Sequence, residues 1–439
     1  MAGLVAGPMV HLAADTGLEE AFPEVLFPEL EAYLGAVADQ GQSQRLGVLT
    51  VEERVGDLDV AKAQRGPSVR FWGRFMGSYE VREDIDNVAR GDVSSNLTVA
   101  QPLYRWGNLK RQEAIAGQQV ELAELDRERR VARELIEARQ LYLGLLLHAE
   151  QARILERSTE LSGQFVEARR QLVEVGQFSE QDVLEMEARL LENRERLGWT
   201  RKRLLEHRQA LERLTGLPVE VALAGRLEQI EPMSAVELAA LREATLGREP
   251  LTGFEGRQWQ LMESIEAERL NILEKRNWPE FDFVAGAYSD RLDAVYAQDS
   301  VFRLRGFAGL QVSWNIFDNW QTKGYQRGAL ARKRAYALRQ RFSAEEDERR
   351  LAALFADLEL TLAQIEARGK REVLLERRLE LLQQYAEENR VTGSERLEGE
   401  IDYLEVRQRL LEARVSYLTN LLQIALLLDK DPFLRDSRD

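Results

Sequence analysis

The chain of 439 residues contains two copies of one unit, and this internal repeat constrains its fold more than any other feature. The 13 residues from Asp182, DVLEMEARLLENR, match the 13 residues from Asp402, DYLEVRQRLLEAR, at eight positions and at an offset of 220. A second match lies upstream at an offset of 213, where side-chain character alternates along both copies. Its positions are Leu97, Val99, Gln101 and Leu103 in the first copy and Leu310, Val312, Trp314 and Ile316 in the second.

Each copy is predicted to contain an opening helix, two strands, a very long helix and a shorter returning helix. Alternation with a period of two is typical of a strand with two different faces. The opening helices are expected at about 18–63, with a break near 41–51, and at about 258–276. We place the first repeat at 15–218, with strands at about 67–79 and 93–104 and helices at about 109–172 and 180–214. A linker covers 219–256, and the second repeat covers 257–432, with strands at about 279–288 and 302–317, helices at about 322–391 and 400–428, and a tail at 433–439.

The predicted helix over about 109–172 contains no proline and would extend roughly 95 Å at 1.5 Å per residue. A glycine-centred break follows at Gly176, and the chain then returns as a second helix that stops at Gly216 and Pro218. Two heptad rows run along this returning helix, which predicts coiled-coil packing with neighbours on both sides. The rows are Leu190, Leu197, Leu204 and Leu211, and Leu184, Leu191 and Leu205.

Composition narrows the classes of partner. The formal charge of −15 lacks the basic footprint of a nucleic-acid-binding protein, so we expect no nucleic-acid partner. No stretch approaches the 18 to 20 apolar residues of a membrane-spanning helix, so any crossing of a bilayer would be made by strands. Residues 1–14 are apolar without Lys or Arg, which fits either the remnant of an export signal or a plain apolar terminus.

The sequence lacks the motifs of an enzyme. It has no Cys, no glycine-rich phosphate loop with its Lys and no nucleophile elbow. Its three histidines, His11, His148 and His207, are far apart in sequence and lack metal-ligand spacing, so we expect packed or solvated helix residues rather than ligands. We therefore expect no catalytic residue, no metal and no cofactor.

Several motifs, taken together, resemble the TolC family of outer-membrane efflux channels over nearly the whole chain. They are the duplicated layout, the run QVSWNIFD from Gln311 to Asp318, the run Arg248-Glu249-Pro250, and a tip at Val175-Gly176 followed six residues later by Asp182. Each motif alone is weak, but they occur in order and in both halves. The second tip departs from the family pattern, because Gly393 lies nine residues before Asp402, which predicts an insertion there.

The resemblance implies a mainly α fold with a small β part. Long antiparallel coiled-coil helices would form an α-barrel in the periplasm, and each chain of a homotrimer would donate four strands to a 12-stranded β-barrel in the outer membrane. The residues argue independently for assembly, since four strands cannot close a barrel and would leave sheet edges unpaired in lipid.

The implied function is that of a passive exit duct of a tripartite efflux pump or type I secretion system. Its partners would be an inner-membrane transporter, a periplasmic adaptor (membrane fusion) protein and outer-membrane lipid. The alternative is a soluble periplasmic coiled-coil protein, structural or adaptor, whose strands form an ordinary sheet.

Three groups of residues are candidates for function. Asp402 and Glu405 match the acidic entrance positions of the family, and Asp182 and Glu185 repeat the spacing in the first copy, so each pair shares a helix face. The candidates for adaptor contact are the tip residues Gly176, Gln177, Phe178, Ser179, Gly393 and Ser394. The candidates for lipid contact or for an interfacial aromatic belt are Phe71, Trp72, Phe75, Trp106, Phe281, Phe283, Trp314 and Trp320. The alternation is expected to leave Arg70, Arg74, Asn96, Gln311 and Asn315 on the opposite face of the strands.

Overall fold

A computed structural model describes residues 22–80, 88–174, 176–177, 179–219, 225–246, 253–292, 301–388 and 390–435. The proposed export remnant, Phe178 and the run at 248–250 lie outside these residues. The chain forms two compact units, one from 1–46, 126–254 and 342–439, the other from 47–125 and 255–341. Each unit therefore takes segments from both sequence repeats.

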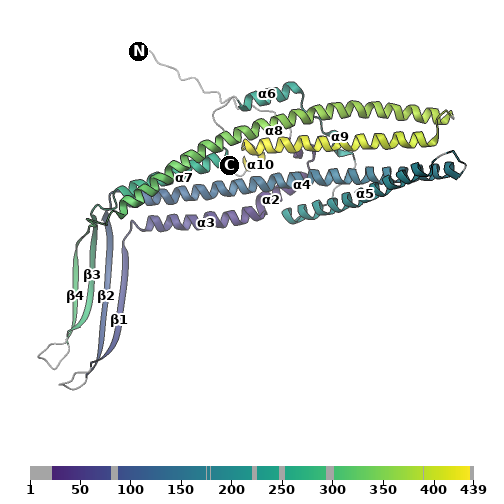
Figure 1. The fold of residues 1–439 in the computed structure, drawn as a ribbon. Helices are drawn as coiled ribbons and strands as arrows, with labels where there is room; N and C mark the ends of the chain where they lie inside the picture. Colours follow the sequence, from purple (N-terminus) through teal and green to yellow (C-terminus); the bar gives the residue numbers. More distant parts are fainter. Residues whose placement is uncertain are drawn as a thin grey trace, which may run out of the picture. The chain divides into compact units, whose positions relative to one another are not determined.

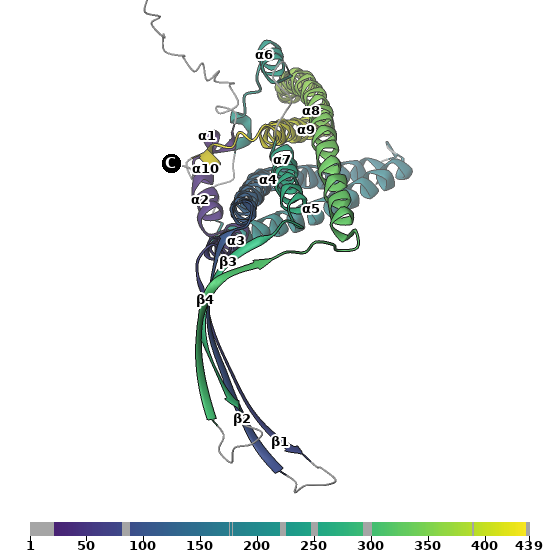
Figure 2. The ribbon, with the colours of Figure 1, turned by 90° about the vertical axis from the view of Figure 1, so that its left-hand side faces the viewer.

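The second unit holds a single four-stranded antiparallel sheet in the order β1-β2-β3-β4, whose strands lie side by side in Figures 1 and 2. The sheet joins the repeats, because β2 of the first pairs with β3 of the second, for example Leu97 with Ala287. A bulge interrupts this pairing between Pro102 and Tyr104. The strands are β1 (Ser68–Glu80), β2 (Val88–Tyr104), β3 (Glu280–Leu292) and β4 (Val301–Ser313).

A two-residue left-handed turn leads from the last strand of each repeat into its long helix. The turn uses Trp106 (φ 55°) and Gly107 (φ 79°) in the first repeat and Asn319 (φ 51°) and Trp320 (φ 66°) in the second. A tryptophan rarely adopts this conformation, so neighbouring contacts must hold it there. For Trp106 these contacts are a hydrogen bond from its indole nitrogen to the carbonyl oxygen of Pro279 at 2.7 Å and ring contacts described below.

The helices beside the sheet in the second unit are joined by polar contacts between the two repeats. Arg111 pairs with Glu268 at 2.6 Å, and Gln118 donates to Ser264 at 2.7 Å. These residues lie on α4 (Asn108–Glu174) and α7 (Phe254–Glu274). The remaining long helices are α3 (Gln42–Ala63) and α8 (Gln321–Glu387).

In the first unit, each long helix turns back as a shorter helix and forms an antiparallel hairpin (Figure 1). The returning helices are α5 (Glu180–Thr215) and α9 (Gly393–Leu427). Val166 of α4 packs with Val183 and Leu190 of α5 in a buried cluster. Both heptad rows of α9 are buried, including Leu410 and Leu411, which confirms neighbours on two sides of that helix.

On α5 the two heptad rows have different environments. Leu190 and Leu211 of the first row are buried, whereas the second row is exposed, with Leu184, Leu191 and Leu205 each more than half accessible. Within the described part of one chain, the second row therefore has no apolar partner. The predicted neighbour on that side of α5 is missing from the isolated chain.

The two hairpin tips have the same length and the same ends, so the predicted insertion at the second tip is wrong. Five residues separate α4 from α5 and α8 from α9. Both long helices end with a backbone bond of the Schellman type, from Gln177 to Leu172 and from Arg390 to Tyr385. Ser179 caps α5 and Thr392 caps α9, 213 residues later. The match at an offset of 220 is thus one heptad out of structural register.

Other boundaries also differ from expectation. α9 begins at Gly393 rather than near 400, because Thr392 and Glu395 form a capping box that starts the helix there. β4 ends at Ser313 rather than 317. The break expected near 41–51 is confined to Gly41, since α2 (Leu30–Gln40) ends there and α3 resumes at Gln42.

Short elements complete the first unit and surround a buried ion cluster. The fully buried guanidinium of Arg139 on α4 binds Glu24 at 2.6 Å and Asp431 at 2.5 Å. Phe22 and Phe433 cover the guanidinium with their rings. The cluster therefore ties both ends of the described chain to α4. The short elements are α1 (Pro23–Leu26), the 3-10 helix η2 (Arg226–Gln229), α6 (Ala235–Leu246) and α10 (Pro432–Arg435).

No helix among the described residues is long and apolar enough to cross a membrane.

Candidate functional surfaces

The register of the sheet separates an apolar face from a polar face. Phe71 pairs with Leu97, Leu97 with Ala287, and Phe283 with Leu310, so the alternating apolar positions of all four strands share one face. This face is open, since the relative exposure of Phe75 is 82% and that of Leu310 is 73%. A continuous exposed apolar face of this kind marks contact with lipid or protein.

The opposite face is polar and basic. Arg70 pairs with Thr98, Arg74 with Ser94, and Tyr288 with Arg305, so these side chains share it. Arg305 donates to the hydroxyl of Tyr288 at 3.2 Å. Positions 96 and 311 fall on this face as expected, whereas Asn315 lies beyond the end of β4.

Trp72 corrects the proposed lipid-facing group. It pairs with Asn96 and lies between Arg70 and Arg74 in the alternation, on the polar face. Its large apolar ring suggested lipid contact, but strand parity decides the side, and Phe71 and Phe75 have the other parity.

Three of the proposed belt residues gather where strands meet helices. The ring of Trp106 packs edge-on against Trp278 at 4.5 Å and against Tyr104 at 4.8 Å between centroids. Beyond the end of β4, the indole nitrogen of Trp314 donates to the carbonyl oxygen of Asn277 at 2.9 Å. Trp320 is exposed, with the ammonium of Lys323 3.9 Å from its ring centroid. Amphipathic rings at such a junction are typical of an interfacial belt.

The acidic candidates do not occupy equivalent positions in the two hairpins. Asp182 is the third residue of α5 after its cap Ser179, whereas Asp402 is the tenth after its cap Thr392, about two helical turns further along. The structural equivalent of Asp182 is Glu395, which binds its own cap. The hydroxyl of Thr392 accepts from the Glu395 backbone at 3.3 Å, and a Glu395 oxygen accepts from the Thr392 backbone at 2.8 Å.

The charges of the second acidic pair are partly compensated within the chain. Asp402 lies 3.3 Å from Arg378 of α8, and Glu405 lies 3.6 Å from Arg409 on its own helix. Asp182 and Glu185 are exposed, and no ion pair joins either to another described residue. The first pair is therefore the less compensated one.

The candidate tip residues fall into two structural groups. Gly176 (φ 73°) and Gln177 form the turn after α4, and Ser179 is a helix cap. Gly393 and Ser394 instead form the first turn of α9, and Ser394 is buried. The second turn thus lies before Gly393, and the position equivalent to Gly176 is 389, outside the described residues.

The structure brings together two histidines that are distant in sequence. His148 of α4 and His207 of α5 approach edge to face with ring centroids 4.8 Å apart. Reflection of the sequence through the tip at Gln177 would have predicted this contact, because antiparallel helices place positions on either side of the turn opposite one another. Among the described residues, no three His, Asp or Glu side chains form a group that could hold a metal ion.

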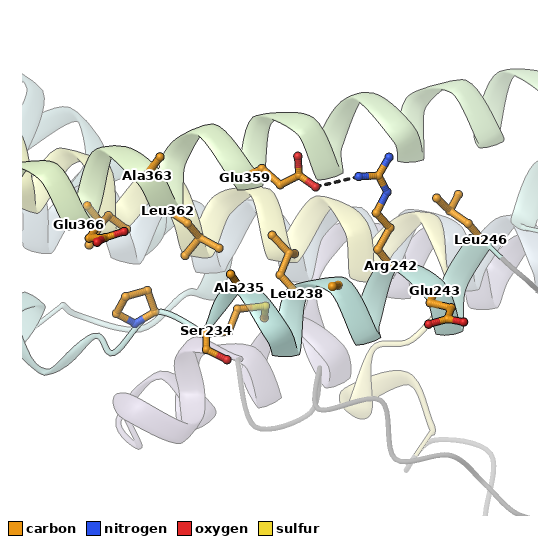
Figure 3. Close-up of a pocket in the computed structure, with 14 residues that line it drawn as sticks. Ser234, Ala235, Leu238, Arg242, Glu243, Leu246, Glu359, Leu362, Ala363 and Glu366 are labelled. Atoms are coloured by element: carbon orange, nitrogen blue, oxygen red, sulfur yellow. Dashed lines mark hydrogen bonds and ion pairs between the residues drawn. The ribbon is translucent and has the colours of Figure 1, made fainter.

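A groove of about 820 Å³ lies between α6 and α8 (Figure 3). Its wall is mainly apolar, and the ion pair between Arg242 and Glu359 crosses it at 2.8 Å. Ser234 in its lining is a helix cap, because its hydroxyl accepts from the backbone nitrogen of Glu237 at 3.2 Å while Glu237 accepts from the Ser234 backbone at 2.7 Å. These contacts describe a structural surface rather than a catalytic one.

A comparison with family models matches residues 48–217 to the family described as outer membrane efflux protein. The match covers the first repeat from α3 to the end of α5. A comparison with curated proteins finds no relative.

Solved channels share the fold at low sequence identity. The CmeC outer membrane channel of Campylobacter jejuni aligns with a TM-score of 0.73 and 11% identity over 99% of this chain and 97% of its own. VceC of Vibrio cholerae aligns at 0.69 and 14% over 91% and 96%, and the open state of the MtrE channel of Neisseria gonorrhoeae at 0.67 and 14% over 91% and 89%.

The chain therefore carries an outer membrane efflux protein domain, and its fold over nearly its whole length is that of the TolC-family channels. This confirms the resemblance and the fold class deduced from the sequence. Members of this class are conduits and not enzymes, as the sequence motifs led us to expect.

Proposed function

We propose that three copies of this chain form the exit duct of an efflux or secretion machine in the outer membrane, with the helical hairpins in the periplasm. The observation that carries the proposal is the sheet itself. Strands β1 and β4 are its edges, and one complete face is apolar and open. Pairing β4 of one copy with β1 of the next would close a 12-stranded barrel and remove every edge.

The exposed heptad row of α5 supports the same assembly. Leu184, Leu191 and Leu205 lie at heptad spacing and are open to solvent in the isolated chain. A neighbouring copy would supply the helix that such a row requires. The proposal thus accounts for unpartnered surfaces in both compact units.

The parity of the strands then assigns the two faces of the barrel. The apolar face with Phe71, Phe75 and Phe283 would contact lipid, and the face with Arg70 and Arg74 would line the lumen. The aromatic rings of Trp106, Trp314 and Trp320 would lie at the membrane boundary.

The hairpin tips are the proposed site of contact with a periplasmic adaptor, which would couple the duct to an inner-membrane transporter. Asp402, Glu405, Asp182 and Glu185 would make the entrance attractive to cations when three copies converge. The duct would perform no chemistry, so the partner transporter would supply the energy.

Conductance in planar bilayers tests this function. The purified protein should produce discrete, step-like openings when added from detergent, and a chain whose apolar face carries charges, such as F71K/F75K, should fail to insert. A wild-type protein that remains monomeric in detergent-free buffer and gives no conductance would instead support the soluble coiled-coil alternative.

A further inference from the structure

The contact between His148 and His207 has a feature that simple ring packing does not require. In both rings the Nδ1 atom is engaged by a nearby oxygen, 2.9 Å from Gln151 Oε1 for His148 and 2.9 Å from the carbonyl oxygen of Arg203 for His207. A carbonyl oxygen can only accept, so His207 donates from Nδ1. Its Nε2 then carries a free lone pair in the neutral ring.

The orientation of Gln151 fixes the same tautomer for His148. The amide nitrogen of Gln151 donates to Glu412 Oε1 at 2.7 Å, which leaves the amide oxygen directed toward His148. His148 must therefore also donate from Nδ1, and its Nε2 is the basic nitrogen. Glu412 is held in turn by Gln408, whose amide nitrogen lies 3.2 Å away.

This arrangement is the one by which proteins prepare histidines as metal ligands. A metal-binding imidazole commonly donates its second N–H to a carbonyl or carboxylate, which sets the ring orientation and raises the basicity of the ligating nitrogen. Two imidazoles that share one Zn²⁺, with Zn–N distances of about 2.0–2.1 Å, place their ring centroids roughly 5 Å apart. The observed separation is 4.8 Å.

Gly144 makes room for this pair. A Cβ atom at this position would approach His207 Cδ2 to 2.5 Å and His207 Nε2 to 2.7 Å. The ring of His207 can therefore lie against α4, one turn before His148, only because residue 144 has no side chain. Glycine is a poor residue for a helix interior, and its presence here fits a packing requirement.

We propose that His148 and His207 form a two-nitrogen site for a divalent d-block cation such as Zn²⁺ or Cu²⁺, with water completing the coordination. Imidazole ligands suit these ions rather than Mg²⁺ or Ca²⁺. The ion would cross-link α4 to α5 within one chain. The site is independent of the proposed conduit function, because both ligands belong to the same hairpin.

The test is a calorimetric titration of the full-length, tag-free protein with ZnCl₂ at pH 7.5 in detergent. We expect one saturable Zn²⁺ site per chain. His148→Gln and His207→Gln should each weaken binding at least tenfold, while His11→Gln, which removes the third histidine of the chain, should leave it unchanged. MgCl₂ should give no saturable heat.

Gly144→Ala provides a variant that retains both ligands. Its methyl group would displace the ring of His207, which can rotate away, so the helix should fold normally and Zn²⁺ affinity should fall at least tenfold. Bound Cu²⁺ should show hyperfine coupling to two nitrogens in the wild type and to one or none in Gly144→Ala. The proposal is overturned if the wild type shows no saturable binding, or if His148→Gln, His207→Gln and Gly144→Ala bind Zn²⁺ like the wild type.

Discussion

Ser179 and Thr392 are equivalent residues, each the N-cap of the returning helix in its hairpin. The hydroxyl of Ser179 accepts from the backbone nitrogen of Gln181 at 3.2 Å, and that of Thr392 accepts from the backbone nitrogen of Glu395 at 3.3 Å. Both tips therefore begin their returning helix by the same device, although their sequences differ. The proposed adaptor contact depends on the order that these caps impose.

Replacing either cap should loosen its tip without unfolding the chain. Thr392→Ala and Ser179→Ala each remove one acceptor for a helical N–H, at a cost of about 1 kcal/mol. Backbone amides in the first turn of the helix should exchange with deuterium about fivefold faster. Thr419→Ala is the control, because the Thr419 hydroxyl donates to Val415 within α9 and caps nothing. Equal exchange in all three variants would contradict the capping roles.

Loss of the buried Arg139 should destabilise the chain far more than loss of an exposed arginine. Burial lowers the pKa of Arg139, but the hydrogen bonds and charges of Asp431 and Glu24 together raise it above its usual value, so the guanidinium stays charged. Arg139→Ala would leave two buried carboxylates uncompensated, and the expected cost is about 3–5 kcal/mol in the free energy of unfolding. Arg377→Ala, which breaks an exposed pair with Glu380, should cost about 0–1 kcal/mol. Denaturant titration compares the two variants, and equal costs would refute the stabilising role of the buried cluster.

The histidine pair should make the stability of the α4–α5 hairpin depend on pH. Burial lowers the pKa of His148 below its usual value, and the neighbouring His207 and Arg203 lower it further, against the opposing effects of Gln151 and Glu412. The unfolded chain then binds the proton more readily than the folded chain. Stability is therefore complete above about pH 6.5 and declines as the pH falls through the folded-state pKa.

Hydrogen exchange of the α4–α5 hairpin at pH 7.5 and pH 5, corrected for intrinsic rates and measured without metal, checks this expectation. Protection should fall at pH 5 in the wild type and fall less in His148→Gln. A loss of protection that is the same in both proteins would exclude His148 as its source.

The two acidic pairs should contribute unequally to ion selectivity if the tips form the entrance. Asp182→Ala/Glu185→Ala removes charges that have no ion-pair partner among the described residues. Asp402→Ala/Glu405→Ala removes charges that are partly balanced by Arg378 and Arg409. Both double variants should reduce preference for K⁺ over Cl⁻, the first more strongly. Reversal potentials across a KCl gradient measure this, and unchanged values in both would remove the acidic residues from the entrance.

The order of elements could be predicted from the sequence because the period changes from two to three-and-a-half or seven at clear glycine and proline boundaries. The register between repeats could not. A leucine-rich charged helix resembles itself when shifted by one heptad, so the match between Asp182 and Asp402 suggested an insertion that the caps Ser179 and Thr392 exclude. Cap residues locate a helix start more firmly than heptads do, because a cap occurs once and a heptad recurs.

Side-chain placement was harder to predict than the elements. Trp72 was assigned by its chemistry, whereas strand parity places it beside Arg70 and Arg74. The cluster around Arg139 joins Glu24 and Asp431 from opposite ends of the chain, and no local pattern announces contacts of that sequence separation. The approach of His148 and His207 differs, since it follows from the predicted hairpin once its turn is placed at the tip.

The most direct test of the shared barrel is the mass of the detergent-solubilised protein, measured by native mass spectrometry after removal of the micelle. Three chains should be found together, because a single chain leaves the edges β1 and β4 unpaired and the heptad row of α5 uncovered. A protein that is monomeric in detergent, and equally monomeric and soluble without it, would contradict the shared barrel.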